Sequence, residues 1–386
     1  MQLQGNWNYP TSIRFGAGRA VELPALCREL GMRRPLLVTD PGLAKLPMLA
    51  RLRSLLSDAG LETALFSDMR PNPVGRDVDA GVAAFRDGRH DGVVAVGGGS
   101  ALDVGKAIAL MSGQKRPLWD FEDVGDNWLR VDPAGVAPTL AVPTTAGTGS
   151  EVGRASLIID EAAHRKVIIF HPAMLPKLVL ADPELTVGLP PALTAATGVD
   201  ALVHNLEAFC SPFYHPIAQG VALEGMRLAH DWLPAAHADG GNLEARAQML
   251  SCSIMGATAF QKGLGGVHAL AHPIGAVFDT HHGLANAVLL PYVLLRNRPA
   301  IAERLSAAAR YLGLANASFD GFLTWVLQLR AGLGIPHTLA EIGIGADAAA
   351  DIGRMAKADP SDGGNPLPLS ADDYRAIFLA AQQGRL

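Results

Sequence analysis

The chain has 386 residues, more than one hydrophobic core usually serves, so we expect two domains. Hydrophobic residues make up 49% and charged residues 18%, a composition that excludes a disordered chain. The formal net charge of −5 includes no block of like charges, and no apolar run approaches the roughly 18 residues of a membrane span, so we expect neither nucleic acid nor membrane as a partner.

The first half of the chain alternates short β-branched runs with helical patterns. The predicted strands lie at 36–39, 93–96, 140–142 and 178–180, and the clearest helices at 78–87 and 101–111. This alternation predicts a parallel sheet covered by helices on both faces.

Prolines are frequent between Pro172 and Pro191, and strand patterns largely cease after this stretch. The remaining sequence is rich in alanine and leucine, which predicts an all-helical second domain. We therefore expect an α/β domain over residues 1–184 and a helical domain over residues 185–386.

Two loops that follow predicted strands suit a nucleotide. In the first, glycines at 97–99 precede Ser100 and Asp103, so bare backbone N–H groups can approach a phosphate at a helix N-terminus. The alternative is a tight turn in which Ser100 and Asp103 form a capping box. In the common dinucleotide fingerprint an acidic residue follows the glycines by about 20 residues. Here the candidate, Asp40, precedes them, which indicates a dinucleotide fold of another topology.

The second loop, 143–151, crowds hydroxyl groups and glycines at the end of another predicted strand. Thr144 and Thr145 suit hydrogen bonding to a pyrophosphate or a ribose, although a Ser/Thr-rich turn would look the same. Two such loops after two strands favour nucleotide binding.

The three cysteines, Cys27, Cys210 and Cys252, form no Cys-x-x-Cys pair, which argues against a disulfide framework and against a thiolate zinc site. Any metal must then be held by nitrogen and oxygen. The residues from Met1 to Trp7 lack the basic and apolar regions of a signal peptide, so we expect a cytoplasmic protein.

Asp200 and His204 are four residues apart in a helical pattern, which places the carboxylate and the imidazole on one face. An ordinary Asp–His hydrogen bond would also explain the pair. Four of the twelve histidines lie within 268–282, where His268 and His272 share a second helix face. Histidines among alanine, leucine and valine are costly to bury without a purpose. Together with Asp200 and His204 they offer the ligands of a divalent cation.

These motifs resemble those of the iron-containing (group III) alcohol dehydrogenases. The resemblance covers nearly the whole chain and is carried by 142–151, by Thr-Ala-Ala-Thr-Gly-Val-Asp-Ala at 194–201 and by His-Ala-Leu-Ala-His-Pro at 268–273. It implies an N-terminal dinucleotide-binding α/β domain, a C-terminal helical domain and a homodimer.

The resemblance also implies a metal, normally ferrous iron and sometimes zinc. The matching ligand positions are Asp200, His204, His268 and His282. His282 is preferred to His281 because the family's glycine follows it and because it lies fourteen residues after His268. His272 matches a nearby histidine that helps to move a proton.

NAD is the implied cofactor. The positions that match nucleotide contacts are Asp40, Asn72, Gly98, Gly99, Ser100, Asp103, Thr144, Thr145 and Lys166. A carboxylate at Asp40 favours NAD over NADP, because it accepts hydrogen bonds from the 2′-hydroxyl and repels a 2′-phosphate.

The chain departs from simple alcohol-oxidising relatives at 153–155 and at 259–265, and both departures resemble the 4-hydroxybutyrate dehydrogenase branch. They bring Arg154 and Lys262 to positions near the family's substrate pocket. We therefore expect a substrate with a carboxylate or similar anion. If instead both side chains reach solvent, or Lys262 pairs with a local carboxylate, a general short-chain alcohol dehydrogenase is expected.

The predicted reaction is hydride transfer between NAD and a small primary alcohol or aldehyde, with a divalent cation to stabilise the alkoxide. Three alternatives stay open: a metal-dependent lyase on the same fold, a metallohydrolase and a non-catalytic metal or nucleotide sensor. The lyase would need a basic cluster for a phosphate-bearing substrate, and the hydrolase would leave both loops without a function.

Overall fold

A computed structural model describes residues 10–163 and 165–386, so the prediction from Met1 to Trp7 lies outside the described residues. The chain divides into two compact units. One is an α/β unit that extends from residue 10 to Thr145 and from Gly149 to Gly188. The other is helical and comprises Leu189–Leu386 with the short segment Ala146–Thr148, an assignment that the sequence did not suggest.

The α/β unit contains eight strands and four α-helices within its described residues. They are β1 (Ser12–Phe15), α1 (Leu23–Glu29), β2 (Pro35–Val38), α2 (Pro47–Asp58), β3 (Ala64–Phe66), α3 (Gly75–Asp87), β4 (Gly92–Gly97), α4 (Gly99–Met111), β5 (Thr139–Pro143), β6 (Ala155–Asp160), β7 (Arg165–Phe170) and β8 (Leu178–Ala181).

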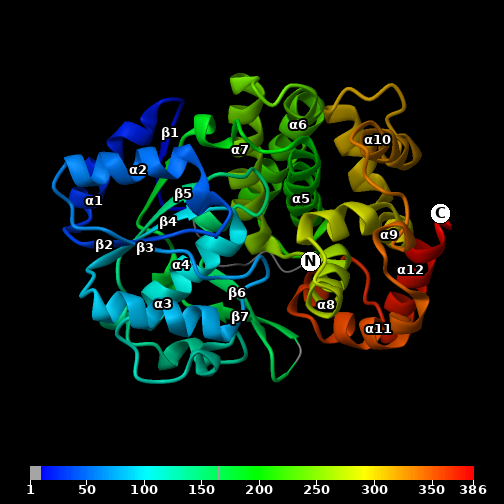
Figure 1. Cartoon of the computed structure of the whole chain (residues 1–386). Coiled ribbons are helices and arrows are strands. Elements are labelled where there is room, and N and C mark those ends of the chain that lie inside the picture. Colours follow the sequence, from blue (N-terminus) through cyan, green and yellow to red (C-terminus); the bar gives the residue numbers. More distant parts are fainter. Residues whose placement is uncertain (1–9, 164) are drawn as a thin grey trace. The chain divides into compact units, whose positions relative to one another are not determined.

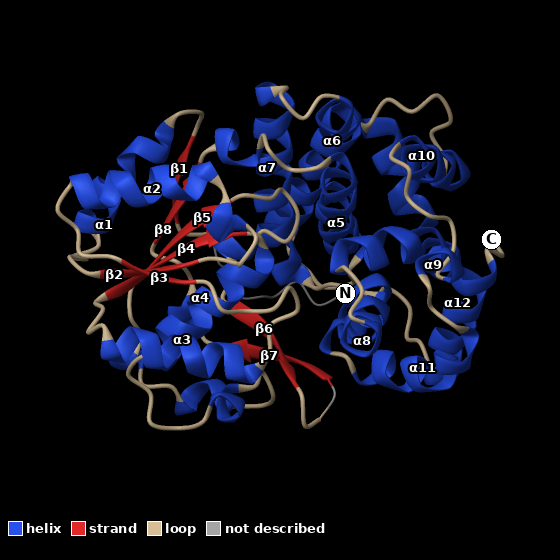
Figure 2. Ribbon diagram, viewed as in Figure 1, coloured by secondary structure: helices blue, strands red, loops and turns tan. Residues whose placement is uncertain are grey.

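Six of these strands form a parallel sheet in the order β1-β8-β5-β4-β2-β3, drawn in red in Figure 2. Strands β2, β4, β5 and β8 are buried along their whole length. Continuous apolar runs are typical of parallel strands that are covered on both faces. These four are the strands that the sequence predicted.

Helices cover both faces of the sheet, as Figure 1 shows for this unit. On one face Leu26 of α1 and Leu52 of α2 share a buried cluster with Val94 and Leu140 of the sheet. On the other face α4 packs against β2, β4 and β5, and α3 packs beside α4. The predicted layered arrangement is confirmed.

Strands β6 and β7 form a separate antiparallel hairpin. Ile159 of β6 pairs with Lys166 of β7 and makes an isolated bridge to Val74. The hairpin packs against α4. Its half-exposed strands interrupt the α/β alternation, and the sequence did not predict them.

The helical unit contains eight α-helices within its described residues. They are α5 (Pro191–Cys210), α6 (Pro216–Ala238), α7 (Leu243–Ala259), α8 (Gly266–Phe278), α9 (His282–Tyr311), α10 (Phe319–Gly332), α11 (Ala349–Ala358) and α12 (Ala371–Gln383). An α/β domain combined with a helical domain is the predicted fold class, which is confirmed.

Helix α5 is buried on nearly all sides and packs against α6, α7 and α9. Burial on all sides is typical of a helix in the core of a domain. Its approach to α7 is close: a Cβ added to Gly256 would lie 2.8 Å from the amide nitrogen of Asn205 and 2.9 Å from Cβ of His204. Helix α5 is therefore a fixed support for its polar side chains.

No helix among the described residues is both long enough and apolar enough to cross a membrane.

Candidate metal centre and nucleotide loops

Three helices of the helical unit bring four predicted metal ligands together. Asp200 and His204 lie one turn apart on α5, His268 lies in the first turn of α8, and His282 is the first residue of α9. Between α8 and α9 the chain reverses through Asp279, whose φ of 52° lies in the left-handed region. This turn is why residues fourteen apart in the sequence meet.

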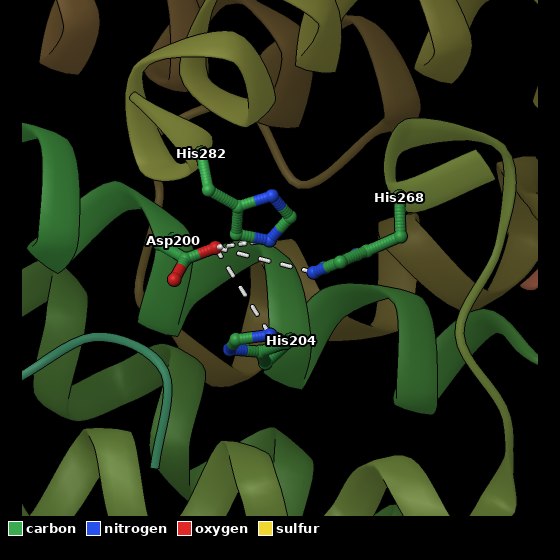
Figure 3. Close-up of side chains that lie close together, drawn as sticks. All are labelled: Asp200, His204, His268 and His282. Carbon is green, nitrogen blue, oxygen red and sulfur yellow. Dashed lines mark ion pairs between the residues drawn. The ribbon is translucent and has the colours of Figure 1, made fainter. Parts of the chain in front are cut away.

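The ligand atoms face one another, as Figure 3 shows. Oδ1 of Asp200 lies 4.0 Å from Nε2 of His204, 3.9 Å from Nε2 of His268 and 3.8 Å from Nε2 of His282. All four ligand atoms lie within 4.8 Å of one another. Bonds of about 2.0–2.2 Å to a central zinc ion would require only a small contraction of this group.

His281, the neighbouring histidine, is the N-cap residue of α9. Its Nδ1 accepts the backbone N–H of Leu284 at 3.4 Å. The structure therefore places the Nε2 atom of His282, and not a nitrogen of His281, in the group of four.

Two of the proposed imidazole ligands differ in how readily they take up a proton. Burial lowers the pKa of His204 to about 4, so this ring is neutral near pH 7. Its Nδ1 lies 3.3 Å from the carbonyl oxygen of Gly147, which leaves Nε2 with a lone pair toward Asp200. Burial also favours a neutral His268, but the carboxylates of Glu207 and Asp200 outweigh it and raise the pKa of His268. Three nitrogens and one oxygen are a ligand set suited to zinc or iron.

His272 lies next to this group. Its ring stacks on that of His282, with centroids 5.4 Å apart and planes 12° apart. Its Nδ1 lies 2.8 Å from Oδ2 of Asp359. Partial burial by itself would raise the pKa of Asp359, but His272 and Ser361 outweigh it and lower this pKa.

The sequence analysis did not identify three polar residues that lie around the four proposed ligands. Glu207 accepts the Nδ1–H of His268 at 2.6 Å, and its spacing from Asp200 along α5 was the available signal. Asn286 donates to Oδ1 of Asp200 at 2.6 Å and lies one turn after His282. Asp359 is remote from the motifs in sequence, so no local pattern indicates it.

The predicted nucleotide residues lie mostly at the carboxyl edge of the parallel sheet. Asp40 follows β2, the glycine loop follows β4, and Thr144 and Thr145 follow β5. From β2 the chain first continues to β3 on one side and then returns to β4 on the other, so the strand order reverses between β2 and β4. Dinucleotides bind at such a switch point in open α/β sheets.

Asp40 and the glycine loop are neighbours although Asp40 comes first in the sequence. Gly97 has a φ of 148°, and a Cβ added to it would lie 2.6 Å from Cβ of Ala101 and 3.7 Å from Oδ2 of Asp40. Oδ1 of Asp40 accepts the backbone N–H groups of Gly42 and Leu43 at 2.8 and 2.9 Å, so the carboxylate is held in place. Strand pairing of β2 with β4 explains the unusual order of the motif.

The alternative capping box of Ser100 and Asp103 is not formed. The Ser100 hydroxyl donates to the carbonyl of Pro71, which brings the segment containing Asn72 beside the start of α4. The Asp103 carboxylate accepts the Ser150 hydroxyl at 2.5 Å and the backbone N–H of Leu157 at 2.9 Å. Asp103 therefore joins α4 to the second loop and to β6.

Below the second loop, Glu151 is a buried carboxyl group whose Oε1 has no hydrogen-bond partner among the described residues. Burial raises the pKa of Glu151 to about 7, although Lys106 partly opposes this. Lys106 is itself buried, and its ammonium group donates to the carbonyl of Ser150 at 3.0 Å.

The two predicted substrate residues have different surroundings. The ammonium group of Lys262 is buried and donates to the carbonyls of Ala208, Phe209 and Ser211 at 2.9, 3.1 and 2.9 Å. Because these three bonds use all its hydrogens at the end of α5, the structure argues against the predicted contact of Lys262 with substrate.

Arg154 lies at the start of the β6–β7 hairpin. Its guanidinium carbon is 5.5 Å from the centroid of the Phe170 ring, and Asp123 acts on it electrostatically. Neither contact is an ion pair that would fix the guanidinium group completely. Arg154 therefore stays a candidate for binding the substrate.

Comparison with known proteins identifies the family of the chain. The model of the iron-containing alcohol dehydrogenases matches residues 10–183, and that of the C-terminal part of the same family matches residues 194–382. The chain therefore belongs to the iron-containing alcohol dehydrogenase family, as its motifs predicted.

Individual relatives match along nearly the whole chain. The chain is 39% identical over 379 residues to a 4-hydroxybutyrate dehydrogenase of Cupriavidus necator, which covers 96% of this chain and 98% of that protein. A solved structure of a 1,3-propanediol oxidoreductase superposes with a TM-score of 0.92 at 34% identity and covers 98% of this chain and 100% of its own. That of a sulfoacetaldehyde reductase from Bifidobacterium kashiwanohense in complex with NAD+ gives 0.89 at 29% identity, with 98% and 99% covered.

Proposed function

We propose that this protein is an NAD-dependent, metal-dependent alcohol dehydrogenase and aldehyde reductase. The observation that carries the proposal is the buried group of Asp200, His204, His268 and His282, with His272 stacked beside it. Family membership and the relative with bound NAD+ support it. A bound ferrous or zinc ion would supply the Lewis acid that stabilises an alkoxide or polarises an aldehyde.

Different residues of the helical unit would bind the cation and transfer the proton. Asp200 and the three imidazoles would hold the cation through Oδ1 and Nε2 atoms. His272 would move the alcohol proton, because its Nδ1 is bonded to Asp359 and its Nε2 is the remaining site for a proton.

The α/β unit would hold the nucleotide. Backbone N–H groups of Gly98 and Gly99 at the start of α4 would face the pyrophosphate, and the Asp40 carboxylate would accept the ribose 2′-hydroxyl. Asn72, Ser100, Thr144, Thr145 and Lys166 are proposed contacts of the same nucleotide, and Asp103 supports the loop through Ser150.

The substrate is proposed to carry an anion at the end away from its alcohol. Two relatives support this, because 4-hydroxybutyrate and sulfoacetaldehyde both combine an acid group with an alcohol or aldehyde. Arg154 is the residue proposed to hold the anion, and Lys262 is not. A neutral substrate is the second candidate. It is favoured by the 1,3-propanediol relative, and by the contacts that Arg154 already has with the Phe170 ring and the charge of Asp123.

The deciding experiment compares succinic semialdehyde with butanal, with NADH and with ferrous iron or zinc, on the wild type and on Arg154→Met. If Arg154 holds the anion, its loss removes a charge-assisted bond of about 1.5–3 kcal/mol and lowers kcat/KM for succinic semialdehyde roughly ten- to a hundredfold, while butanal changes little.

Arg165→Met is the matched control, because Arg165 lies on the same hairpin and pairs with Glu122 at the surface. Better turnover of butanal by the wild type, or an equal loss for both aldehydes in Arg154→Met, would leave the neutral substrate. No turnover of any aldehyde with NADH would contradict the dehydrogenase itself.

A homodimer, which the resemblance to the family implies, and the expected cytoplasmic location belong to the same proposal. The lyase alternative gains no support, because the relatives described above are named as dehydrogenases, reductases or oxidoreductases.

A further inference from the structure

Glu207 is a buried carboxylate that lies on the same face of α5 as two of the proposed metal ligands. Asp200, His204 and Glu207 follow one another at intervals of four and three residues, which places them on one stripe of the helix. Glu207 is 6% exposed. It is not one of the four residues whose ligand atoms converge.

The carboxylate receives three N–H groups from a single stretch of chain at the start of α8. Oε2 accepts Nδ1–H of His268 at 2.6 Å and the backbone N–H of Gly265 at 2.9 Å. Oε1 accepts the backbone N–H of Val267 at 2.7 Å. One side chain of α5 therefore holds both the N-terminus of α8 and the imidazole ring on it.

These contacts decide which nitrogen of His268 can bind a cation. Both oxygens of Glu207 already accept backbone N–H groups, from Gly265 and Val267, so the hydrogen of the contact with His268 is assigned to Nδ1. The lone pair is then on Nε2, and this atom faces Oδ1 of Asp200 at 3.9 Å. A metal-bound histidine commonly has its second nitrogen fixed in this way by a carboxylate.

We propose that Glu207 is a positioning residue of the metal centre, which fixes the tautomer and the orientation of His268 so that Nε2 faces the cation. The inference rests on the proposed metal site and adds a residue to it. Helix α5 then supplies two ligands directly and orients a third, which lies on another helix.

The test measures zinc affinity by competition with a chelator, without turnover. Glu207→Gln keeps the size of the side chain but replaces one acceptor oxygen with an NH2 group, which cannot accept any of the three N–H groups. We expect zinc affinity to fall about 10- to 100-fold, the usual effect of removing such a partner. An affinity within threefold of the wild type would overturn the proposal.

The matched control is Asn365→Ala. Oδ1 of Asn365 accepts the backbone N–H of Gly266 at 3.0 Å, so this variant loosens the same end of α8 without touching His268. We expect it to lower the thermal midpoint and to keep zinc affinity within threefold. If it loses as much affinity as Glu207→Gln, the effect comes from the helix end and the proposed role of Glu207 is wrong.

Failure of the metal site is separable from failure of this inference. A wild type that binds no zinc would contradict the proposed site. If His268→Ala loses zinc affinity while Glu207→Gln keeps the wild-type affinity, only the role of Glu207 is contradicted. If Glu207→Gln does not fold, ¹⁵N NMR of histidine in the zinc-loaded wild type decides. We expect His268 to carry its proton on Nδ1 and zinc on Nε2, and zinc on Nδ1 would overturn the proposal.

Discussion

The Nδ1 atom of His272 lies 2.8 Å from Oδ2 of Asp359, although 87 residues separate the two in the chain. The other carboxylate oxygen of Asp359 accepts the backbone N–H of Ser361 at 2.8 Å, so the carboxylate is fixed at its own end as well. The ring of His272 is thereby held against that of His282. Asp359 thus orients the proposed proton carrier without contacting the four ligand atoms.

Asp359→Asn should therefore separate proton movement from metal binding. We expect kcat to fall roughly 10- to 100-fold, a part of the 10²- to 10⁴-fold that acid–base catalysis contributes, while bound zinc stays at the wild-type level. Asp362→Asn is the control, because Asp362 lies in the short helix Pro360–Gly364 that Asp359 caps, and it pairs with Lys357 and Tyr374 instead. Loss of zinc from Asp359→Asn would contradict this division of roles.

The choice between two adjacent histidines gives a second prediction. His282→Ala should lose metal and turnover together, as should alanine at Asp200, His204 or His268. His281→Ala should keep its metal, because the ring of His281 accepts the Leu284 N–H at the start of α9. Metal content after dialysis decides the matter. Metal retained by His282→Ala but lost by His281→Ala would show that the ligand choice is wrong.

Cofactor preference is tested at Asp40. Because Gly42 and Leu43 hold its carboxylate beside Gly97, a 2′-phosphate there would meet a fixed negative charge. We expect the wild type to prefer NADH over NADPH and Asp40→Gly to narrow the ratio of the two kcat/KM values. The variant also loses the two turn hydrogen bonds, so its thermal midpoint must be recorded. Equal kcat/KM for both cofactors in the wild type would contradict the prediction.

The sequence predicted those elements whose residues carry a local pattern. Strands β2, β4, β5 and β8 are continuous apolar runs, and Asp200 and His204 are a helical pair. Strands β1 and β3 are short and partly exposed, so they lack such a run. Strands β6 and β7 do contain apolar runs, at 157–159 and 167–170, which the sequence analysis did not assign to strands.

Contacts between distant segments could not be predicted in this way. The place of Lys262 depends on where the last carbonyls of α5 point, and the contact of Asp359 with His272 depends on the packing of the helices. No local sequence pattern indicates either contact. The sequence shows that Asp40 precedes the glycine loop. Only the pairing of β2 with β4 explains why the two are nevertheless neighbours.

The contacts of Lys262 predict that its loss lowers the stability of the folded protein. Lys262→Met removes a cation from three carbonyls at the end of α5, where Arg304 also donates to Cys210 and Ser211. Unpaired buried acceptors cost about 1–3 kcal/mol each, so we expect a clearly lower thermal midpoint. The ratio of kcat/KM for succinic semialdehyde to that for butanal should stay at its wild-type value. A selective loss of succinic semialdehyde turnover would return Lys262 to the substrate site.

The last prediction concerns pH and the buried Glu151. Its pKa is raised by burial from 4.5 in the unfolded chain to about 7 in the folded one, so between these values the unfolded chain has released a proton that the folded chain keeps. Stability must therefore fall as pH rises through this window. Glu151→Gln cannot ionise, so the stability of the variant relative to the wild type should rise by on the order of 3 kcal/mol between pH 4.5 and 7.5.

The measurement is the urea midpoint of both proteins from pH 4.5 to 7.5 with a chelator present, so that metal binding does not contribute. Histidines titrate in the same range, but they are common to both proteins and cancel in the difference. Glu161→Gln provides the baseline, because Glu161 lies at the exposed end of the β6–β7 hairpin and pairs with Arg70 and Arg76. A difference between Glu151→Gln and the wild type that stays constant with pH would show that Glu151 is already ionised below pH 5. Its unpartnered Oε1 would then have to be stabilised by Lys106 more strongly than burial opposes it.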